Sequence, residues 1–331
     1  MSVENSMPKL PENHSHSPFL IYSETIKKLM KRTTLIAGQR GPVLIEGESG
    51  SGKTRLAEEL HKLSNRANGP FLEIGCGELS YGGGSFESAL FGHTRDAYTG
   101  ADSFQQGIIA QANGGVLVLN DIDRLPPECQ GRFLRFLDDG HFTRVGEPGT
   151  SIDVDVRVVA TTNKELADLV KQDLFLHDLF FRLKQWRIKV PPLRRRPEDI
   201  RRLAHYYLEG FRRENQETSK TGGKWTFSDQ VYGLFLTMQW PDNIRGLRSA
   251  VENIALFCEG DRKEISLKQA ADVLFDPEYN DYVTSLGKND KSYLLSVLKL
   301  TNWNIKLASL ITGFSRTTIY KWAKEEGWDK G

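Results

Sequence analysis

Short apolar runs recur through the first part of the chain, and segments with helical spacing separate them. The run Val43–Ile45 precedes Leu56, Ala57, Leu60 and Leu63, which are spaced to share one face of a helix. Short buried strands that alternate with helices are typical of a parallel sheet covered on both faces. The pattern therefore predicts an α/β domain, with further strands at Phe71–Ile74, Val116–Leu119, Val154–Ala160 and Trp186–Val190.

Other patterns flank this domain. Residues 1–18 are polar and contain proline, and we expect a flexible tail there. A helical pattern then begins near Ile21 and continues through Ile26. Beyond Pro191 the chain changes to helices rich in charge, which indicates a second, smaller domain. A break near Pro277 precedes a compact helical unit at residues 282–331.

The last unit has the pattern of a helix-turn-helix. Apolar positions indicate a support helix around Tyr293–Leu298 and a second helix over Ile305–Ile311. Gly313 is placed to make the turn, and Ser315 is placed to cap a third helix. The expected core residues are Ala308, Ile311, Phe314, Ile319 and Trp322, and the expected outward residues are Arg316, Thr317, Tyr320 and Lys321.

The distribution of charge favours DNA binding by this last unit. Residues 282–331 contain eight Lys and Arg against four Asp and Glu, a local charge of +4. The whole chain has a net charge of only +1, so DNA contact must be local. We expect the third helix to read the major groove. The alternative is a helical oligomerisation module with a solvated basic face.

Length and composition indicate the number of domains and the cellular compartment. A length of 331 residues with 39% hydrophobic content suits two or three domains with a sizeable core. Cys76, Cys129 and Cys258 are odd in number, far apart and without metal-binding spacing, which favours a reducing compartment. No apolar run approaches ~18 residues, and the N-terminus lacks a signal-peptide pattern. We expect a cytoplasmic protein with no membrane partner.

The most specific motif is the segment Gly47-Glu48-Ser49-Gly50-Ser51-Gly52-Lys53-Thr54, which matches G-x-x-x-x-G-K-[ST]. It lies between a predicted strand and a predicted helix, as this phosphate-binding pattern requires. Glycines let backbone N–H groups surround phosphate oxygens, and the helix N-terminus favours the negative charge. Lys53 would contact the β- and γ-phosphates of ATP, and the Thr54 hydroxyl would bind Mg²⁺.

A second motif places the chain in a family. Ala89-Leu90-Phe91-Gly92-His93 leads into Asp96-Ala97-Tyr98-Thr99-Gly100-Ala101. This segment resembles the GAFTGA loop of bacterial enhancer-binding proteins, the AAA+ ATPases that activate sigma-54 RNA polymerase. In that family the loop contacts the sigma factor. Tyr98 keeps the aromatic ring, whereas Asp96 adds a charge where the family has glycine.

Further landmarks follow in the family's order. Gly114–Leu119 resembles the Walker B strand, and Val158–Asn163 resembles sensor I. Pro191–Arg194 resembles the linker to a helical lid, and Trp240–Arg245 resembles sensor II, with Arg245 at the phosphates. The terminal unit resembles a Fis-type DNA-binding domain. The resemblance implies an AAA+ α/β subdomain at 19–192, a lid at 193–276 and a DNA-binding domain at 282–331. It also implies a ring, expected to be a hexamer, with ATP at each subunit boundary.

The departures from the family fall on ATP hydrolysis. Where the family has Asp-Glu after the Walker B strand, this chain has Asn120-Asp121. Gly75 stands where the family's restraining asparagine is expected, and Leu176 replaces one of two arginine fingers while Arg182 keeps the other. Losing an arginine finger costs roughly 10³–10⁵ in rate. The resemblance assigns catalysis to Asn120, Asp121, Asn163 and Arg182, and Mg²⁺ binding to Thr54 and Asp121, with Asp123 as another available carboxylate.

Two functions remain open at this point. The chain is either an ATPase that remodels sigma-54 polymerase, or an ATP-binding, non-hydrolysing DNA-binding regulator. Such a regulator would either join a ring with a competent paralogue or act on polymerase without remodelling it. The sigma-contact motif favours the first and the altered Walker B pair favours the second. The terminal helix-turn-helix argues against a third interpretation, that the chain is an AAA+ chaperone. Since no sensory domain fits in residues 1–18, we expect control by a regulatory protein in trans, by a ligand or by expression level.

Overall fold

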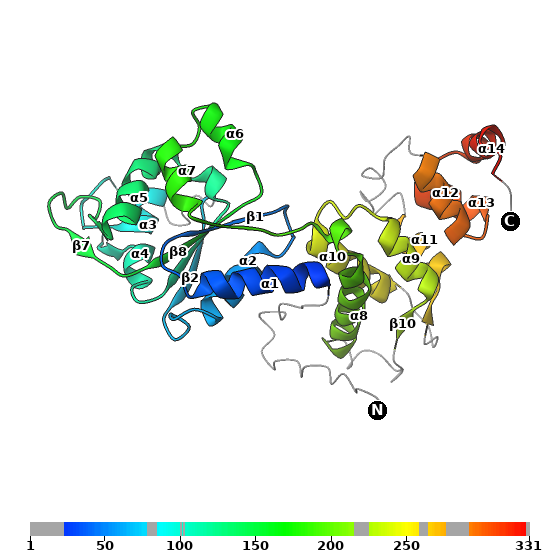
Figure 1. The fold of residues 1–331 in the computed structure, drawn as a ribbon, viewed down its shortest axis with the longest axis horizontal. Coiled ribbons are helices and arrows are strands. Elements are labelled where there is room, and N and C mark those ends of the chain that lie inside the picture. The colour runs from blue at the N-terminus through cyan, green and yellow to red at the C-terminus, as the bar shows by residue number, and fades with distance from the viewer. Residues whose placement is uncertain are drawn as a thin grey trace. The chain divides into compact units, whose positions relative to one another are not determined.

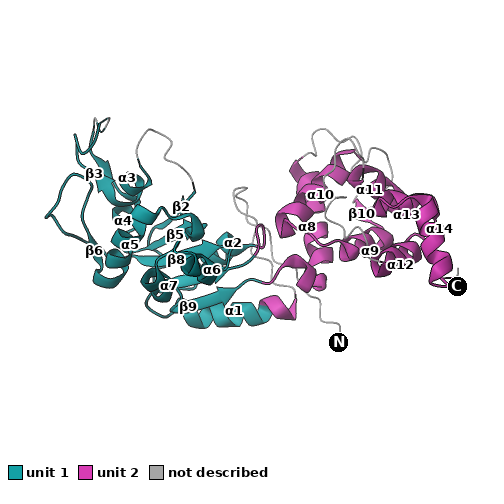
Figure 2. Cartoon of the chain, turned by 90° about the horizontal axis from the view of Figure 1, so that it is seen from above, with its two compact units in different colours: residues 1–21, 27–47, 52–190 teal, residues 22–26, 48–51, 191–331 magenta. Residues whose placement is uncertain are grey.

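The structure is a computed structural model that describes residues 23–77, 85–99, 101, 103–214, 225–257, 264–275 and 291–328. The described chain forms two compact units (Figures 1 and 2). Unit 1 comprises residues 27–47 and 52–190, and unit 2 comprises residues 23–26, 48–51 and the chain from Pro191 onward. The phosphate-loop segment is therefore divided, since Glu48–Ser51 belongs to unit 2.

Unit 1 contains the predicted parallel sheet. Its strands are β1 (Val43–Glu46), β2 (Phe71–Gly75), β5 (Val116–Asn120), β8 (Arg157–Thr162) and β9 (Trp186–Lys189). Their order is β2-β5-β8-β1-β9, and every neighbouring pair is parallel. The α/β class is confirmed.

One strand prediction had the wrong boundaries. The run Val154–Ala160 was expected to be a single strand, but β8 begins at Arg157 and ends at Thr162. Residues 154–156 are in no strand, and they follow a separate antiparallel hairpin of β6 (His141–Phe142) and β7 (Ile152–Asp153). The polar residues Asp153 and Asp155 interrupt the apolar run, so only the later part has the uninterrupted buried pattern of a central strand.

The two faces of the sheet in unit 1 differ in their side chains and in the helices that cover them. Leu72 and Ile74 of β2 and Leu117 and Leu119 of β5 belong to the main apolar core. Because side chains alternate along a strand, Glu73, Gly75, Val118 and Asn120 lie on the opposite face. The helices that contribute to this apolar core are α3 (Phe86–Phe91), α4 (Ile108–Gln111), α5 (Pro127–Asp139) and α7 (His177–Leu183). Helix α2 (Lys53–Lys62) contacts β1, β5 and β8, and it buries Leu56, Ala57 and Leu60.

The remaining elements of unit 1 are short, apart from α1 (Glu24–Ala37), whose first residues belong to unit 2. They are the antiparallel pair β3 (Gly92–His93) and β4 (Gln105–Gln106), the 3₁₀ turn η1 (Ile122–Arg124) and α6 (Leu166–Lys171). Cys76 and Cys129 are free and buried, and Cys258 lies outside the described residues. Burial raises the pKa of the Cys129 thiol to about 12, which keeps it protonated.

Unit 2 is mainly helical, as the charge-rich pattern predicted. It contains η2 (Leu193–Arg195), α8 (Pro197–Glu214), α9 (Asp229–Thr237), α10 (Asn243–Phe257) and α11 (Leu267–Leu274), with the short parallel pair β10 (Thr226–Phe227) and β11 (Glu264–Ile265). Trp240 and Phe235 are fully buried, and their rings pack at a centroid distance of 5.7 Å. Every helix among the described residues is too short or too polar to cross a lipid bilayer.

The end of unit 2 has the three expected helices, α12 (Lys291–Leu300), α13 (Ile305–Thr312) and α14 (Arg316–Glu325). Gly313 ends α13 with a φ of 71°, and the Ser315 hydroxyl accepts a hydrogen bond from Thr318 N. The turn and cap predictions are confirmed. Ala308, Ile311 and Ile319 are fully buried, whereas the half-buried Phe314 and Trp322 pack edge to face at 5.0 Å.

Candidate functional site

The phosphate loop begins at β1 and ends at α2. Within unit 1, Gly47 N donates to Thr162 O at 3.1 Å, so the loop begins at the carboxyl end of the sheet. Gly52 precedes α2 with a φ of 103°, a conformation that strains any other residue. Lys53 is buried, and its Nζ donates to Gly47 O at 2.9 Å. The predicted strand, turn and helix are therefore in place.

The tip of the loop, Glu48–Ser51, packs against its own unit 2. Gly50 has a φ of 67°, and a Cβ there would lie 2.1 Å from Asp242 O. Ile244 N donates to Gly50 O at 3.0 Å, so α10 begins against the loop. The exposed Arg245 follows directly, and its Cβ would lie 3.1 Å from a Cβ at Gly50. The structure thus brings the predicted sensor II arginine beside the loop tip.

Two polar residues that sequence reasoning missed hold this tip. Arg194 binds Glu48 with two hydrogen bonds of 2.6 and 2.7 Å, which lower the pKa of Glu48. Asn243 is fully buried and donates from Nδ2 to Ser49 O at 2.9 Å, while its Oδ1 accepts from Leu193 N at 2.7 Å. Its φ of 51° is a conformation that asparagine tolerates better than most residues. Both residues lie inside motifs recognised in the sequence, Arg194 in the linker motif and Asn243 in the sensor II motif, but neither was assigned a role there.

The end of β5 lies beside the start of α2. Asn120 Oδ1 accepts from Thr54 Oγ1 at 3.4 Å and from Thr161 Oγ1 at 3.1 Å. Asn120 Nδ2 donates to Glu73 Oε2 at 3.0 Å. The amide of Asn120 thus connects the phosphate-loop threonine with a carboxylate on β2. Glu73 was another residue that sequence reasoning missed, although a charge inside an otherwise apolar strand was a signal.

The two acidic residues after Asn120 differ in environment. Asp121 has a φ of 53°, and its backbone N donates to Thr161 Oγ1 at 3.3 Å. The side chain of Asp123 is fully buried, where Oδ1 accepts from Thr162 Oγ1 at 2.9 Å and Lys164 Nζ lies 3.3 Å from Oδ2. Asp121 is therefore the more accessible carboxylate, whereas Asp123 is held by its neighbours. Asn163, expected in sensor I, is exposed in the bend after β8.

These residues fit a magnesium ion that arrives with ATP. Mg²⁺ keeps several waters and is usually held by one or two protein oxygens together with phosphates. Thr54 Oγ1 and Asn120 Oδ1 are two such oxygens, and the carboxylates of Glu73 and Asp121 supply negative charge nearby. Among the described residues no group of three or more His, Cys, Asp or Glu could hold a metal alone. The donor set therefore suits Mg²⁺·ATP better than a resident metal.

Arg182, predicted to be the remaining arginine finger, lies on α7. Arg182 Nε lies 3.0 Å from Asp138 Oδ1, and its Nη2 donates to Leu137 O at 3.0 Å. Leu176, in place of the other arginine, is 44% exposed at the start of the same helix, and Phe181 is 50% exposed.

The predicted sigma-contact loop is a tight turn in unit 1. Asp96 N donates to Ala101 O at 2.8 Å, and Ala101 N donates to Tyr98 O at 3.0 Å. Asp96 has a φ of 62°, which asparagine and aspartate adopt more readily than other non-glycine residues, so the change from glycine is tolerated. The Tyr98 ring packs edge to face on His93 at 5.2 Å, and Thr99 is exposed. Gly100 lies outside the described residues.

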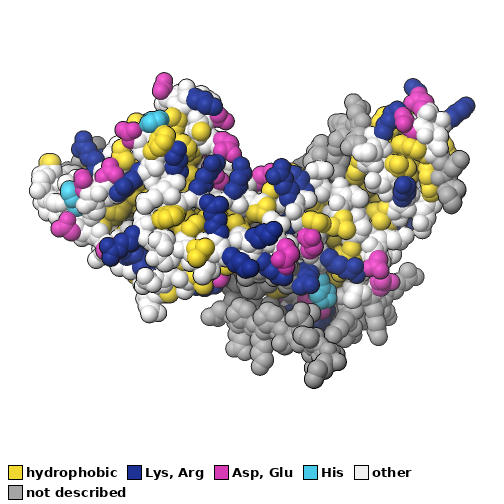
Figure 3. Space-filling view, viewed as in Figure 1, with side chains coloured by type: hydrophobic (Ala, Val, Ile, Leu, Met, Phe, Trp, Pro, Cys, Tyr) yellow, Lys and Arg dark blue, Asp and Glu magenta, His cyan; other side chains and the backbone are white. Residues whose placement is uncertain are grey.

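The outward positions of α14 are exposed as predicted. Arg316, Thr317, Tyr320 and Lys321 all lie on the surface, and Tyr320 is 61% exposed. Elsewhere basic and acidic side chains are interspersed over the face of the molecule shown in Figure 3. This agrees with the low net charge and with a DNA contact limited to one element.

Comparison with known families decides the class. The model of the sigma-54 interaction domain matches residues 19–189, and that of the AAA+ ATPase lid domain matches residues 194–277. The chain belongs to the sigma-54-dependent activator family. The family match includes the phosphate loop and the sigma-contact loop, and the lid match begins at Arg194, which binds Glu48.

Relatives in this activator family are transcriptional regulatory proteins. The chain is 35% identical to ZraR of Klebsiella oxytoca over 90% of its own length and 66% of that protein. It is 33% identical to AtoC of Escherichia coli over 94% of its length and 68% of that protein. It is 37% identical to the Nif-specific regulatory protein of Rhodobacter capsulatus over 75% of its length, but spans only 42% of that relative.

Solved structures also match this family member. NtrX of Brucella abortus in complex with ADP superposes with a TM-score of 0.69 at 26% identity, over 93% of this chain and 69% of that one. The complex of the same protein with ATP gives a TM-score of 0.68. The parallel-sheet fold is therefore shared with a protein whose structures contain ADP and ATP.

Proposed function

We propose that this protein activates transcription by sigma-54 RNA polymerase, using Mg²⁺·ATP in an oligomeric ring in the cytoplasm. The observation that carries the proposal is the phosphate loop of an activator-family chain, folded between β1 and α2 with Lys53 buried at its base. Gly47–Thr54 would bind the phosphates, with Arg245 as a further cation. Thr54 and Asn120 would hold Mg²⁺, which supplies charge neutralisation at the phosphates.

The ring would place Arg182 of one subunit at the nucleotide of its neighbour. Support comes from its position on α7, where exposed Leu176 and Phe181 offer apolar surface for association. Arg182 would exchange Asp138 for the neighbour's phosphates, since both partners are anionic oxygens. A hexamer is the assembly that the family resemblance favours.

The loop Asp96–Ala101 would contact sigma-54. Thr99→Ala is expected to weaken binding of purified sigma-54 at least about ten-fold, as for a residue central to an interface. ATP affinity should stay unchanged, because the loop's described hydrogen bonds are to its own hairpin and its neighbours in unit 1. Pull-down titrations in the presence of an ATP analogue would compare Thr99→Ala with the control Thr34→Ala, which changes an exposed threonine on α1. Wild-type protein that binds no sigma-54 in any nucleotide state would contradict the activator proposal.

DNA would be read by α14. Arg316→Ala is expected to weaken specific binding by roughly 1–3 kcal/mol if its guanidinium contacts a base edge. The measurement is a titration with a duplex selected by the wild-type protein from a random pool, beside an unselected duplex. Lys324→Ala, at the other end of the same exposed helix, is the matched control. Equal loss on both duplexes would make Arg316 a phosphate contact, and no loss would refute its placement.

A second function is favoured by the altered pair Asn120-Asp121. If the amide at this position blocks hydrolysis, the protein is an ATP-binding DNA regulator that acts in a mixed ring with a competent paralogue. Steady-state ATP turnover of the purified protein, alone and with DNA, separates the two functions. Measurable turnover supports the remodelling activator, whereas tight ATP binding without turnover supports the regulator.

A further inference from the structure

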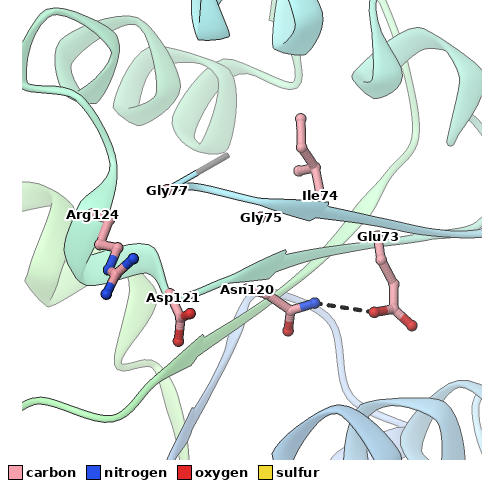
Figure 4. A pocket seen from close by; sticks show the side chains of 7 residues that line it. All are labelled: Glu73, Ile74, Gly75, Gly77, Asn120, Asp121 and Arg124. Atoms are coloured by element: carbon pink, nitrogen blue, oxygen red, sulfur yellow. Dashed lines mark hydrogen bonds between the residues drawn. The ribbon is translucent and has the colours of Figure 1, made fainter. Parts of the chain in front are cut away.

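Asn120 stands on β5 where the family has aspartate, and the neighbouring strand β2 has a carboxylate, Glu73, beside it. A pocket of about 310 Å³ at the carboxyl ends of β2 and β5 is lined by Glu73, Ile74, Gly75, Gly77, Asn120, Asp121 and Arg124. Figure 4 shows the side chains of Glu73, Asn120 and Asp121 on one side of these strands, with Ile74 on the other. Glu73 is therefore the carboxylate that β2 adds to the site.

The hydrogen bonds give Asn120 one orientation. An ionised carboxylate can only accept, so the Asn120 amide nitrogen faces Glu73 and its oxygen faces the two threonine hydroxyls. Thr54 is the threonine that ends the phosphate-loop motif, so the amide oxygen is aimed at the place where a metal ion would meet the loop. Without Glu73, nothing in this set would distinguish the two ends of the amide.

The pairing of Glu73 with Asn120 also affects the negative charge at the site. The family's aspartate places one negative charge directly at this strand end, whereas Asn120 is neutral. A carboxylate that accepts from the ligand's own amide polarises it and increases the electron density on the amide oxygen, as outer partners do for metal ligands elsewhere. The pair Glu73–Asn120 thus keeps a negative charge at the site, moved from β5 to β2.

We propose that Glu73 is a positioning residue for the Mg²⁺ that accompanies ATP, acting through Asn120. This inference rests on the proposed ATP binding and names a residue that the family resemblance does not assign. It also explains why the change from aspartate to asparagine is compatible with a complete phosphate loop. Asn120 alone would lower the attraction for the metal, and Glu73 offsets that loss.

The test compares ATP affinity in Mg²⁺ with ATP affinity in EDTA, by calorimetric titration of the full chain. Glu73→Gln keeps the size of the side chain and removes its charge. It is expected to reduce the gain in affinity that Mg²⁺ provides about ten-fold, the lower range for outer partners of metal ligands, with affinity in EDTA unchanged. Asp168→Asn is the control, because it removes an exposed carboxylate of unit 1 that pairs with Lys171 on α6.

A charge exchange separates positioning from general structural support. Glu73→Gln with Asn120→Asp returns the carboxylate to β5 and is expected to restore the Mg²⁺ effect. An unchanged Mg²⁺ effect in Glu73→Gln, or an equal loss of affinity in both buffers, would overturn this inference while leaving ATP binding intact. No ATP binding by the wild-type protein in either buffer would overturn the proposed function as well.

Discussion

Lys53→Ala is expected to weaken ATP binding more than 100-fold while the protein stays folded. The Lys53 ammonium would make two charge-assisted hydrogen bonds to phosphates, each contributing about 1.5–3 kcal/mol. A loss of about 3 kcal/mol corresponds to slightly more than 100-fold in affinity. In the structure its Nζ donates to Gly47 O, a carbonyl of the phosphate loop itself, so the alanine variant is expected to retain the strand and helix around it. Fluorescence titration with a labelled ATP would measure the change.

The matched control for this experiment lies on the same helix. Lys62→Ala removes an exposed lysine at the far end of α2, where Lys62 pairs with Glu59. Its ATP affinity should equal that of the wild type, and both variants should keep the wild-type melting temperature within a few degrees, as is usual for substitutions outside the packed core. Unchanged ATP affinity in Lys53→Ala would contradict the assignment of the phosphate site.

Restoring the family's acidic pair is expected to raise ATP turnover about ten-fold or more. The variant carries Asn120→Asp and Asp121→Glu, which add charge near Mg²⁺ and lengthen the carboxylate that would orient water. Glu73→Gln accompanies them, because Asn120 Nδ2 lies 3.0 Å from Glu73 Oε2 and two carboxylates at that spacing repel. Ten-fold is about 1.4 kcal/mol of barrier, a modest demand on two restored contacts.

The same variant with Glu73 retained is the informative comparison. It should gain less, since the new carboxylate at position 120 would face Glu73. Gly75 and Leu176 remain unrepaired in both and limit the gain. A phosphate-release assay at saturating Mg²⁺·ATP would measure turnover. Rapid hydrolysis by the wild-type protein, with neither variant faster, would show that Asp121 or Asp123 already serves and that the altered pair does not limit the rate.

Much of the fold could be read from local patterns. The phosphate loop needs glycines at fixed positions between a strand and a helix, and Gly52 has the positive φ that this requires. Gly313 and Ser315 likewise mark the turn and cap of the terminal helices. Each of these features depends on residues within a few positions of one another, so the chain's order of side chains contains the whole signal.

One boundary could not be read in this way. Val154–Ala160 looked like one strand because its valines continue through Asp155, but its first residues follow a hairpin and only Arg157–Thr162 join the central sheet. An apolar run alone does not say which of its residues find strand partners. The pairing of β8 with β1 and β5 decided that.

The sequence by itself determined the nucleotide motif, the activator family and the departure at Asn120. Only the tertiary structure decided which residues surround Asn120. Strand β2 lies next to β5, and this order puts Glu73 beside Asn120, 47 positions away. Asn243 reaches Ser49 across 194 positions because the loop tip and α10 belong to the same unit. Such contacts depend on the order of strands and the packing of helices, which no local pattern of apolar and polar residues specifies.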